Sequence, residues 1–148
     1  MSCAKALISF HSSYNVLSLF QKQGSAGLLE LFPYGLDEST LSQFAKLASL
    51  RHLHYQSWIN FNADTSVASV KSASVLSHLD QIVAEKIVKL EHVAPVSCCN
   101  DAALLYKLNQ VTTVGIDEFL SMFQQFWDDL IQVSISCTNY QSCKNNSS

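Results

Sequence analysis

Apolar residues recur every three or four positions along most of this chain, and this spacing constrains the fold more than any other feature. It places apolar side chains on one face of a helix, which must then be buried against another helix. The strongest repeat comprises Ile116, Phe119, Leu120, Phe123, Trp127, Leu130 and Ile131. Earlier repeats comprise Leu7, His11, Tyr14, Leu17 and Phe20, then Leu41, Phe44, Leu47 and Leu50, then a run from Val75 to Val93.

The few turn-forming residues point the same way. Four glycines and two prolines in 148 residues force few turns, which favours helices over a many-stranded sandwich. We therefore predict an all-α fold, a compact bundle of about six helices. Residues 1–136 are expected to form this single helical domain, and the polar residues 137–148 a frayed carboxyl-terminal tail.

Charge and cysteine content exclude several classes of protein. Charged residues make up 14% of the chain and its formal net charge is −3, whereas a nucleic-acid binder needs clustered lysine and arginine. No run reaches the ~18–20 apolar residues of a membrane span, so we expect no membrane insertion. The apolar patch at residues 6–10 is too short for a secretory signal. Five cysteines, an odd number, favour reduced thiols and a cytoplasmic location.

The sequence contains no pattern that predicts catalysis or metal binding. The sequence contains neither a phosphate-binding glycine-rich loop nor a nucleophile elbow. His92 with Cys98 or Cys99 could make an activated thiolate, but small buried cysteines are common in cores without any chemistry. On a helix, His52 and His54 would point about 200° apart, so they could not share an ion. We predict no catalytic residues, no metal ligands and no cofactor, and therefore no enzyme.

The segment from Leu104 to Phe123 resembles an EF-hand, which is a helix, a twelve-residue loop and a second helix. On that pattern the loop runs from Lys107 to Glu118. Val114 takes the apolar position that pairs with a neighbouring loop, and Glu118 takes the final acidic position.

A second segment, Leu17 to Leu28, looks like the first hand of calmodulin and myosin light chains, with its loop opening at Gln21. Calcium needs about six or seven oxygen ligands. Lys107 at the first position of the later loop and Phe32 at the last position of the earlier loop cannot supply them. The resemblance therefore implies two lobes of degenerate, calcium-independent EF-hands.

The same resemblance implies a non-enzymatic interaction module that binds an amphipathic target helix, such as a myosin neck helix. The candidate partner-binding residues are Phe119, Met122, Phe123, Phe126 and Trp127, at least half of which we expect to pack in the core. Two alternatives stay open. One is a helical scaffold or adaptor that self-associates or sits in a larger complex. The other is a small-ligand or enzymatic domain that uses His92 and the nearby thiols.

Overall fold

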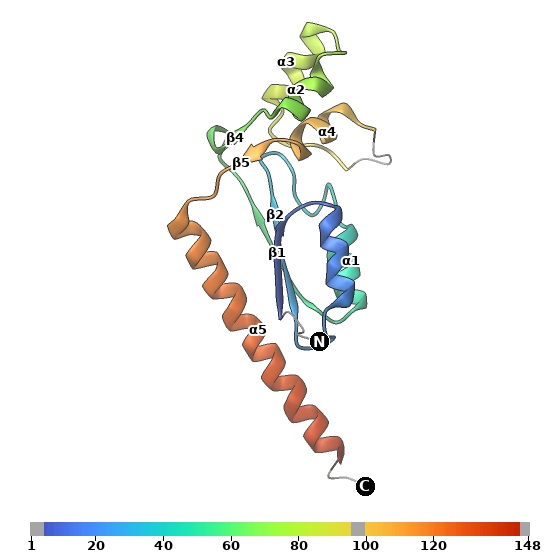
Figure 1. Ribbon diagram of the computed structural model, residues 1–148, viewed down its shortest axis with the longest axis vertical. Helices are drawn as coiled ribbons and strands as arrows, with labels where there is room; N and C mark the ends of the chain where they lie inside the picture. The colour runs from blue at the N-terminus through green and yellow to red at the C-terminus, as the bar shows by residue number, and fades with distance from the viewer. Residues whose placement is uncertain (1–4, 96–99, 146–148) are drawn as a thin grey trace. The chain divides into compact units, whose positions relative to one another are not determined.

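The computed structural model describes residues 5–95 and 100–145. The protein is mixed α/β, with a three-stranded parallel sheet and a two-stranded sheet beside its helices (Figure 1). The prediction of an all-α bundle is therefore wrong. The chain divides into two compact units. The first comprises Met1–Glu30, Gln43–Gln56 and Gly115–Ser148, and the second comprises Leu31–Ser42 and Ser57–Val114.

The larger sheet has the strand order β1 (Ala6–Phe10), β2 (Gly27–Phe32), β3 (His54–Ile59). All six residues of β2 are buried. A parallel strand covered on both faces consists of a continuous apolar run rather than an alternating pattern. Such a short run cannot be told from a buried helical segment by periodicity, which is why these residues did not predict a strand.

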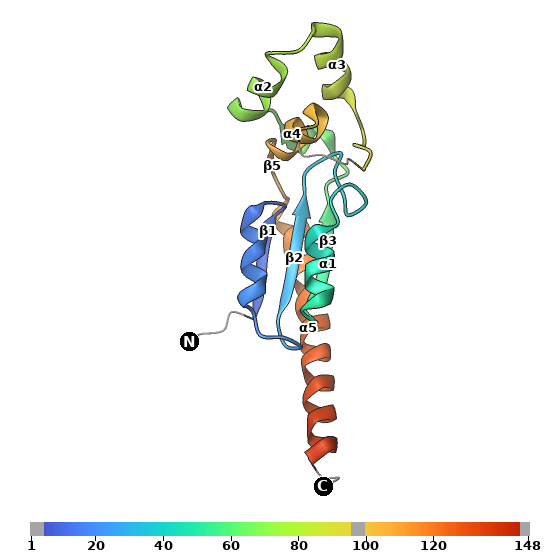
Figure 2. The ribbon, with the colours of Figure 1, turned by 90° about the vertical axis from the view of Figure 1, so that its right-hand side faces the viewer.

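The first unit has helices on both faces of its part of the sheet (Figures 1 and 2). The 3₁₀ helix η1 (Ser13–Phe20) and α1 (Gln43–Leu50) pack together on one face, and α5 (Ile116–Asn145) lies on the other. A Cβ at Gly27 would lie 2.8 Å from Cζ of Phe126. The missing side chain at the start of β2 therefore lets α5 approach the sheet closely.

The part of the first apolar repeat that lies in η1 faces solvent rather than the core. The segment predicted as one helix is β1 followed by η1. In η1 the buried residues are Asn15 and Ser18, whereas Tyr14, Leu17 and Phe20 are half or more exposed. The periodicity is present, but its polar side is the buried one, because the core here contains a polar cluster.

The second unit contains short elements around its own core. These are η2 (Ala63–Thr65), β4 (Ser66–Val67), α2 (Val70–Leu76), α3 (Gln81–Lys89), α4 (Ala102–Leu108) and β5 (Val111–Thr112). Helix α4 packs against α2 and α3, and β4 pairs antiparallel with β5. The core consists of Phe32, Leu36, Leu41, Val93 and Leu104.

Two predictions about the helices have different outcomes. The sequence from Cys98 to Gln110 predicts a short helix with Asn100 or Asp101 near its start. The side chain of Asp101 accepts a hydrogen bond from the amide of Leu104 and caps α4, which confirms that start. The long helix predicted between Val75 and Val93 is instead α2 and α3, because Asp80 caps a new helix. Within the described residues, no helix is both long and apolar enough to cross a membrane.

The structure replaces both predicted EF-hand loops with other elements. In the later loop, Lys107 is a buried residue of α4, and Val111 and Thr112 form β5. In the earlier loop, the half that ends at Phe32 is the buried strand β2. The residues of β2 and β5 pair with other strands, and Lys107 is helical, in place of the loop pairing of EF-hands.

Candidate functional site

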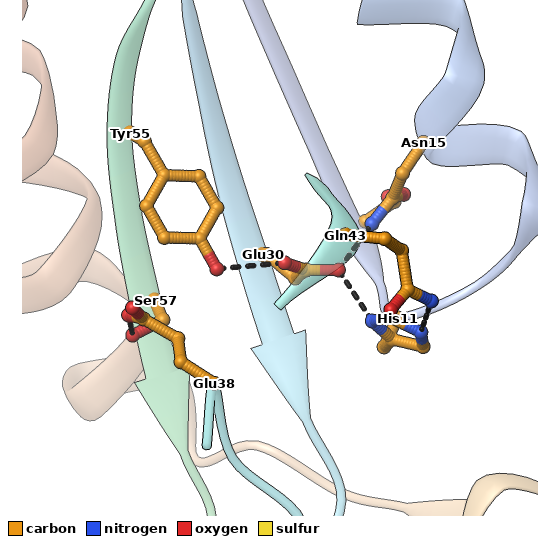
Figure 3. A network of polar contacts seen from close by, with 8 residues as sticks. His11, Asn15, Glu30, Glu38, Gln43, Tyr55 and Ser57 are labelled. Atoms are coloured by element: carbon orange, nitrogen blue, oxygen red, sulfur yellow. Dashed lines mark hydrogen bonds and ion pairs between the residues drawn. The ribbon is translucent and has the colours of Figure 1, made fainter. Parts of the chain in front are cut away.

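The first unit contains a buried polar cluster centred on Glu30, which is fully inaccessible to solvent (Figure 3). Its Oε1 accepts a hydrogen bond of 2.8 Å from Nδ2 of Asn15 and lies 2.6 Å from Nδ1 of His11. Its Oε2 accepts a hydrogen bond of 2.7 Å from the hydroxyl of Tyr55. We call these four residues the Glu30 cluster. Three donors around one carboxylate replace the water that its burial removes.

Four elements of the first unit position this cluster. His11 directly follows β1, Asn15 lies in η1, Glu30 in β2 and Tyr55 in β3. The hydroxyl of Ser9 donates to Oδ1 of Asn15, which turns the amide nitrogen of Asn15 toward Glu30. The parallel strands thus bring side chains from residues 11 to 55 around one carboxylate.

The imidazole of His11 has contacts on both of its nitrogens. Nδ1 faces Glu30, and Nε2 lies 3.1 Å from Nε2 of Gln43. The ring of Phe44 is tilted against it, with 5.3 Å between the ring centroids. His11 is buried, whereas Gln43, the first residue of α1, is exposed. The outer nitrogen of this buried histidine is therefore contacted by the end of an exposed side chain.

The second unit contains a buried lysine, Lys107. Its Nζ donates to the carbonyl of Val88 at 3.4 Å and lies 4.8 Å from the ring centroid of Tyr34. Burial lowers the pKa of Lys107. Because Val88 is in the last turn of α3, the ammonium lies at the negative end of that helix dipole. This contact explains the lysine as a structural cation.

Asp37 begins a polar turn in the same unit. Its Oδ1 accepts hydrogen bonds from the amides of Ser39 and Thr40 at 2.8 and 3.1 Å, and Oδ2 lies 3.7 Å from Nδ1 of His92. Burial alone would raise the pKa of Asp37, but these hydrogen bonds and His92 together lower it. Beside this turn, the hydroxyl of Ser57 donates to Oε1 of Glu38.

The sequence-predicted site residues fall in different surroundings. Cys98 and Cys99, the suggested partners of His92, lie outside the described residues. Among the side chains that the structure describes, in residues 5–95 and 100–133, no three of His, Cys, Asp or Glu group as metal ligands do.

In α5, Met122 and Phe126 are buried. Phe119, Phe123 and Trp127 are partly buried and form a continuous row of rings, with centroids 6.1 and 5.9 Å apart. The partner-binding role of these five residues stays a prediction, as do a protein partner and a cytoplasmic location.

The Glu30 cluster was missed from the sequence, although one signal was available. Glu30 is a single charged residue within the run Leu-Leu-Glu-Leu-Phe. A carboxylate inside a run that is otherwise apolar must find buried donors, so it marks a polar site within a core.

A parallel strand–helix–strand arrangement with polar residues after a strand defines a broad class of α/β proteins, which bind ligands outside the carboxyl ends of their strands. No known protein-family model matches the chain. Over 129 residues, 84% of the chain, it is 30% identical to the zebrafish (Danio rerio) protein O-linked-mannose β-1,4-N-acetylglucosaminyltransferase 2. It is 28% identical to the protein of the same name from Xenopus tropicalis and 27% identical to that from Mus musculus, again over 84% of the chain. The chain spans 22% of the length of each of these relatives.

These similarities correct three predictions. The relatives are named glycosyltransferases, so the resemblance to calmodulin and myosin light chains is wrong. The prediction of a calcium-independent, light-chain-like binder is wrong for the same reason. The names also contradict the prediction that the chain is not an enzyme, because they point to one. The reason for the error is physical: a helix, a polar turn and an acidic helix start occur in many folds, and the pattern carries no chemistry without its oxygen ligands.

Proposed function

We propose that this chain takes part in glycosyl transfer, and that its first unit contributes to binding the nucleotide-linked N-acetylglucosamine that serves as sugar donor. The observation that carries the proposal is the 30% identity, over 84% of the chain, to a transferase whose name specifies N-acetylglucosamine and O-linked mannose. Since the chain matches about a fifth of that protein, we propose a contribution to the reaction and not the complete activity.

The donor side of the reaction is favoured by the position of the Glu30 cluster. In open α/β sheets, ligands bind beyond the carboxyl ends of the strands. His11 is the first residue beyond the carboxyl end of β1, and Ser12 and Ser13 lead into η1. Ser12 is partly exposed and Ser13 exposed, so both hydroxyls are available to a ligand. Buried, hydrogen-bonded side chains behind such a segment hold it in one conformation before a ligand binds.

The test is a titration of the isotope-labelled full chain with UDP-N-acetylglucosamine, followed by backbone amide NMR. We expect saturable shifts that are largest at residues 9–15 and around Glu30. Free mannose at the same concentrations serves as a control sugar and should not reproduce them. If millimolar UDP-N-acetylglucosamine leaves all amide signals unchanged, the proposal of donor binding is wrong.

A variant separates specific binding from weak surface contact. Replacing Ser12 and Ser13 together with alanine should reduce the shifts, because these two hydroxyls directly follow His11 beyond the carboxyl end of β1. Replacing the exposed Ser74 of α2 with alanine is the matched control and should leave them unchanged. Equal shifts in all three proteins would place the ligand elsewhere.

A further inference from the structure

The proton on the imidazole of His11 is placed by its neighbours. The carboxylate of Glu30 can only accept hydrogen bonds, and it lies 2.6 Å from Nδ1, so Nδ1 carries a proton. The amide nitrogen of Gln43, 3.1 Å from Nε2, can only donate. In this arrangement Nε2 is the acceptor of the contact with Gln43, and Nδ1 is the donor to Glu30.

The side chain of Gln43, which contacts Nε2 of His11, is one that a ligand could displace. Gln43 is exposed, and its long side chain loses rotamer freedom to make a single neutral hydrogen bond, whose net contribution is small. The charge-assisted contact of Nδ1 with Glu30 is stronger and buried. Removal of Gln43 from Nε2 would thus leave the orientation of His11 intact.

From this geometry we infer that Nε2 of His11 is a recognition point for a ligand hydroxyl, which displaces the side chain of Gln43 and donates its hydrogen bond to the same nitrogen. A phosphate oxygen at neutral pH is an acceptor and cannot take this place, whereas a ribose or sugar hydroxyl is a donor and can. Glu30 acts as a positioning residue, because its carboxylate fixes which nitrogen of His11 accepts. This inference rests on the proposed donor binding, and it specifies a hydroxyl as the group of the donor that the site recognises.

The test combines imidazole ¹⁵N NMR of His11 with titrations of three probes: UDP-N-acetylglucosamine, UDP and N-acetylglucosamine. In the free protein we expect the signature of a neutral ring protonated on Nδ1. A ring protonated on Nε2 would overturn the inference before any probe is added. With UDP-N-acetylglucosamine, the Nε2 signal should shift while Nδ1 keeps its proton. A shift with UDP identifies a ribose hydroxyl, and a shift only with the sugar-containing probes identifies a sugar hydroxyl.

Variants of Gln43 provide a second, independent measurement. Gln43→Ala removes the competing donor and should tighten UDP-N-acetylglucosamine binding by about two- to tenfold. Gln43→Glu puts a carboxylate beside Nε2, which favours a proton there and should weaken binding. Lys46→Ala, an exposed change one turn along α1, is the control and should change neither the affinity nor the signals of His11.

The two proposals fail in different ways. If UDP-N-acetylglucosamine binds at residues 9–15 but the signals of His11 do not move and Gln43→Ala binds no more tightly, this inference is wrong and donor binding stands. If none of the three probes binds, both proposals are wrong.

Discussion

Replacing Glu30 tests the buried cluster most severely. Glu30→Leu removes the carboxylate while keeping an apolar side chain of similar length, and it leaves the ring N–H of His11, the amide of Asn15 and the hydroxyl of Tyr55 without their common acceptor. Glu30→Gln keeps one oxygen, which can face His11 and Asn15. Its new amide group can then donate to the hydroxyl of Tyr55, which is able to turn and accept.

The expected losses of stability follow from these contacts. A buried donor left unsatisfied costs about 1–3 kcal/mol, so three donors set an upper range of about 3–9 kcal/mol. Because Tyr55 is only partly buried, its hydroxyl has a smaller share in this cost, and we expect about 2–6 kcal/mol for Glu30→Leu, from the two buried donors of His11 and Asn15. Glu30→Gln loses charge assistance but also the desolvation of a charge, so its net loss should be about 1–2 kcal/mol.

The assay is urea unfolding followed by tryptophan fluorescence. The chain has two tryptophans, one in each unit, so a Trp58→Phe background leaves Trp127 of α5 to report on the first unit. Asp129→Leu, at an exposed position of α5, is the matched control and should stay within about 0.5 kcal/mol. If Glu30→Leu is no more destabilising than Glu30→Gln, then the carboxylate of Glu30 does not hold the donors of His11, Asn15 and Tyr55.

Three further changes have defined outcomes. Gly27→Ala should lower the free energy of unfolding by about 1–3 kcal/mol, because the added Cβ would overpack against Phe126. Gly115→Ala is the control and should not lower it, because its Cβ would meet its nearest neighbour at 3.9 Å. Equal effects of the two changes in calorimetry would contradict the packing of α5. The lowered pKa of Asp37 contributes stability above its unfolded value near 3.8, which is lost as pH falls through the folded pKa. Asp37→Asn should flatten that acid slope in denaturation curves, and an unchanged slope would refute it. Because the pKa of Lys107 is lowered, the free energy of unfolding should rise as pH increases from the folded pKa toward 10.5, the ordinary pKa of a lysine. Lys107→Met should remove that rise and be at least as stable as the unchanged protein at pH 7. A large loss of stability at pH 7 would show that the protein needs the cation.

Local signals in the sequence predicted what depends on local chemistry. The cap at Asp101 was predictable because one side chain and one amide make it. The strand β2 was not, since its burial on both faces depends on the helices that cover them, and α5 among these is distant in sequence. Within η1, the repeat of Tyr14, Leu17 and Phe20 gave the wrong inner face, because periodicity does not tell which side of a helix is buried when the core beside it is polar.

The candidate site depends even more on long-range contacts. Glu30 meets His11, Asn15 and Tyr55 only after three strands have aligned, so no spacing in the sequence reveals the cluster. The similarity to the transferases extends over 129 residues at 30% identity. Because the identical residues are spread over the chain, short catalytic motifs do not reveal it. What the sequence did offer was one charged residue inside an apolar strand.

The most direct test of donor binding by the first unit is photocrosslinking of the full chain with an azido-uridine analogue of UDP-N-acetylglucosamine, followed by mass-spectrometric mapping of the labelled peptide. The proposal predicts label on the peptide that contains His11 to Asn15, and loss of that label when unmodified UDP-N-acetylglucosamine is added in excess. Label confined to the second unit, or label that excess donor does not displace, would contradict it.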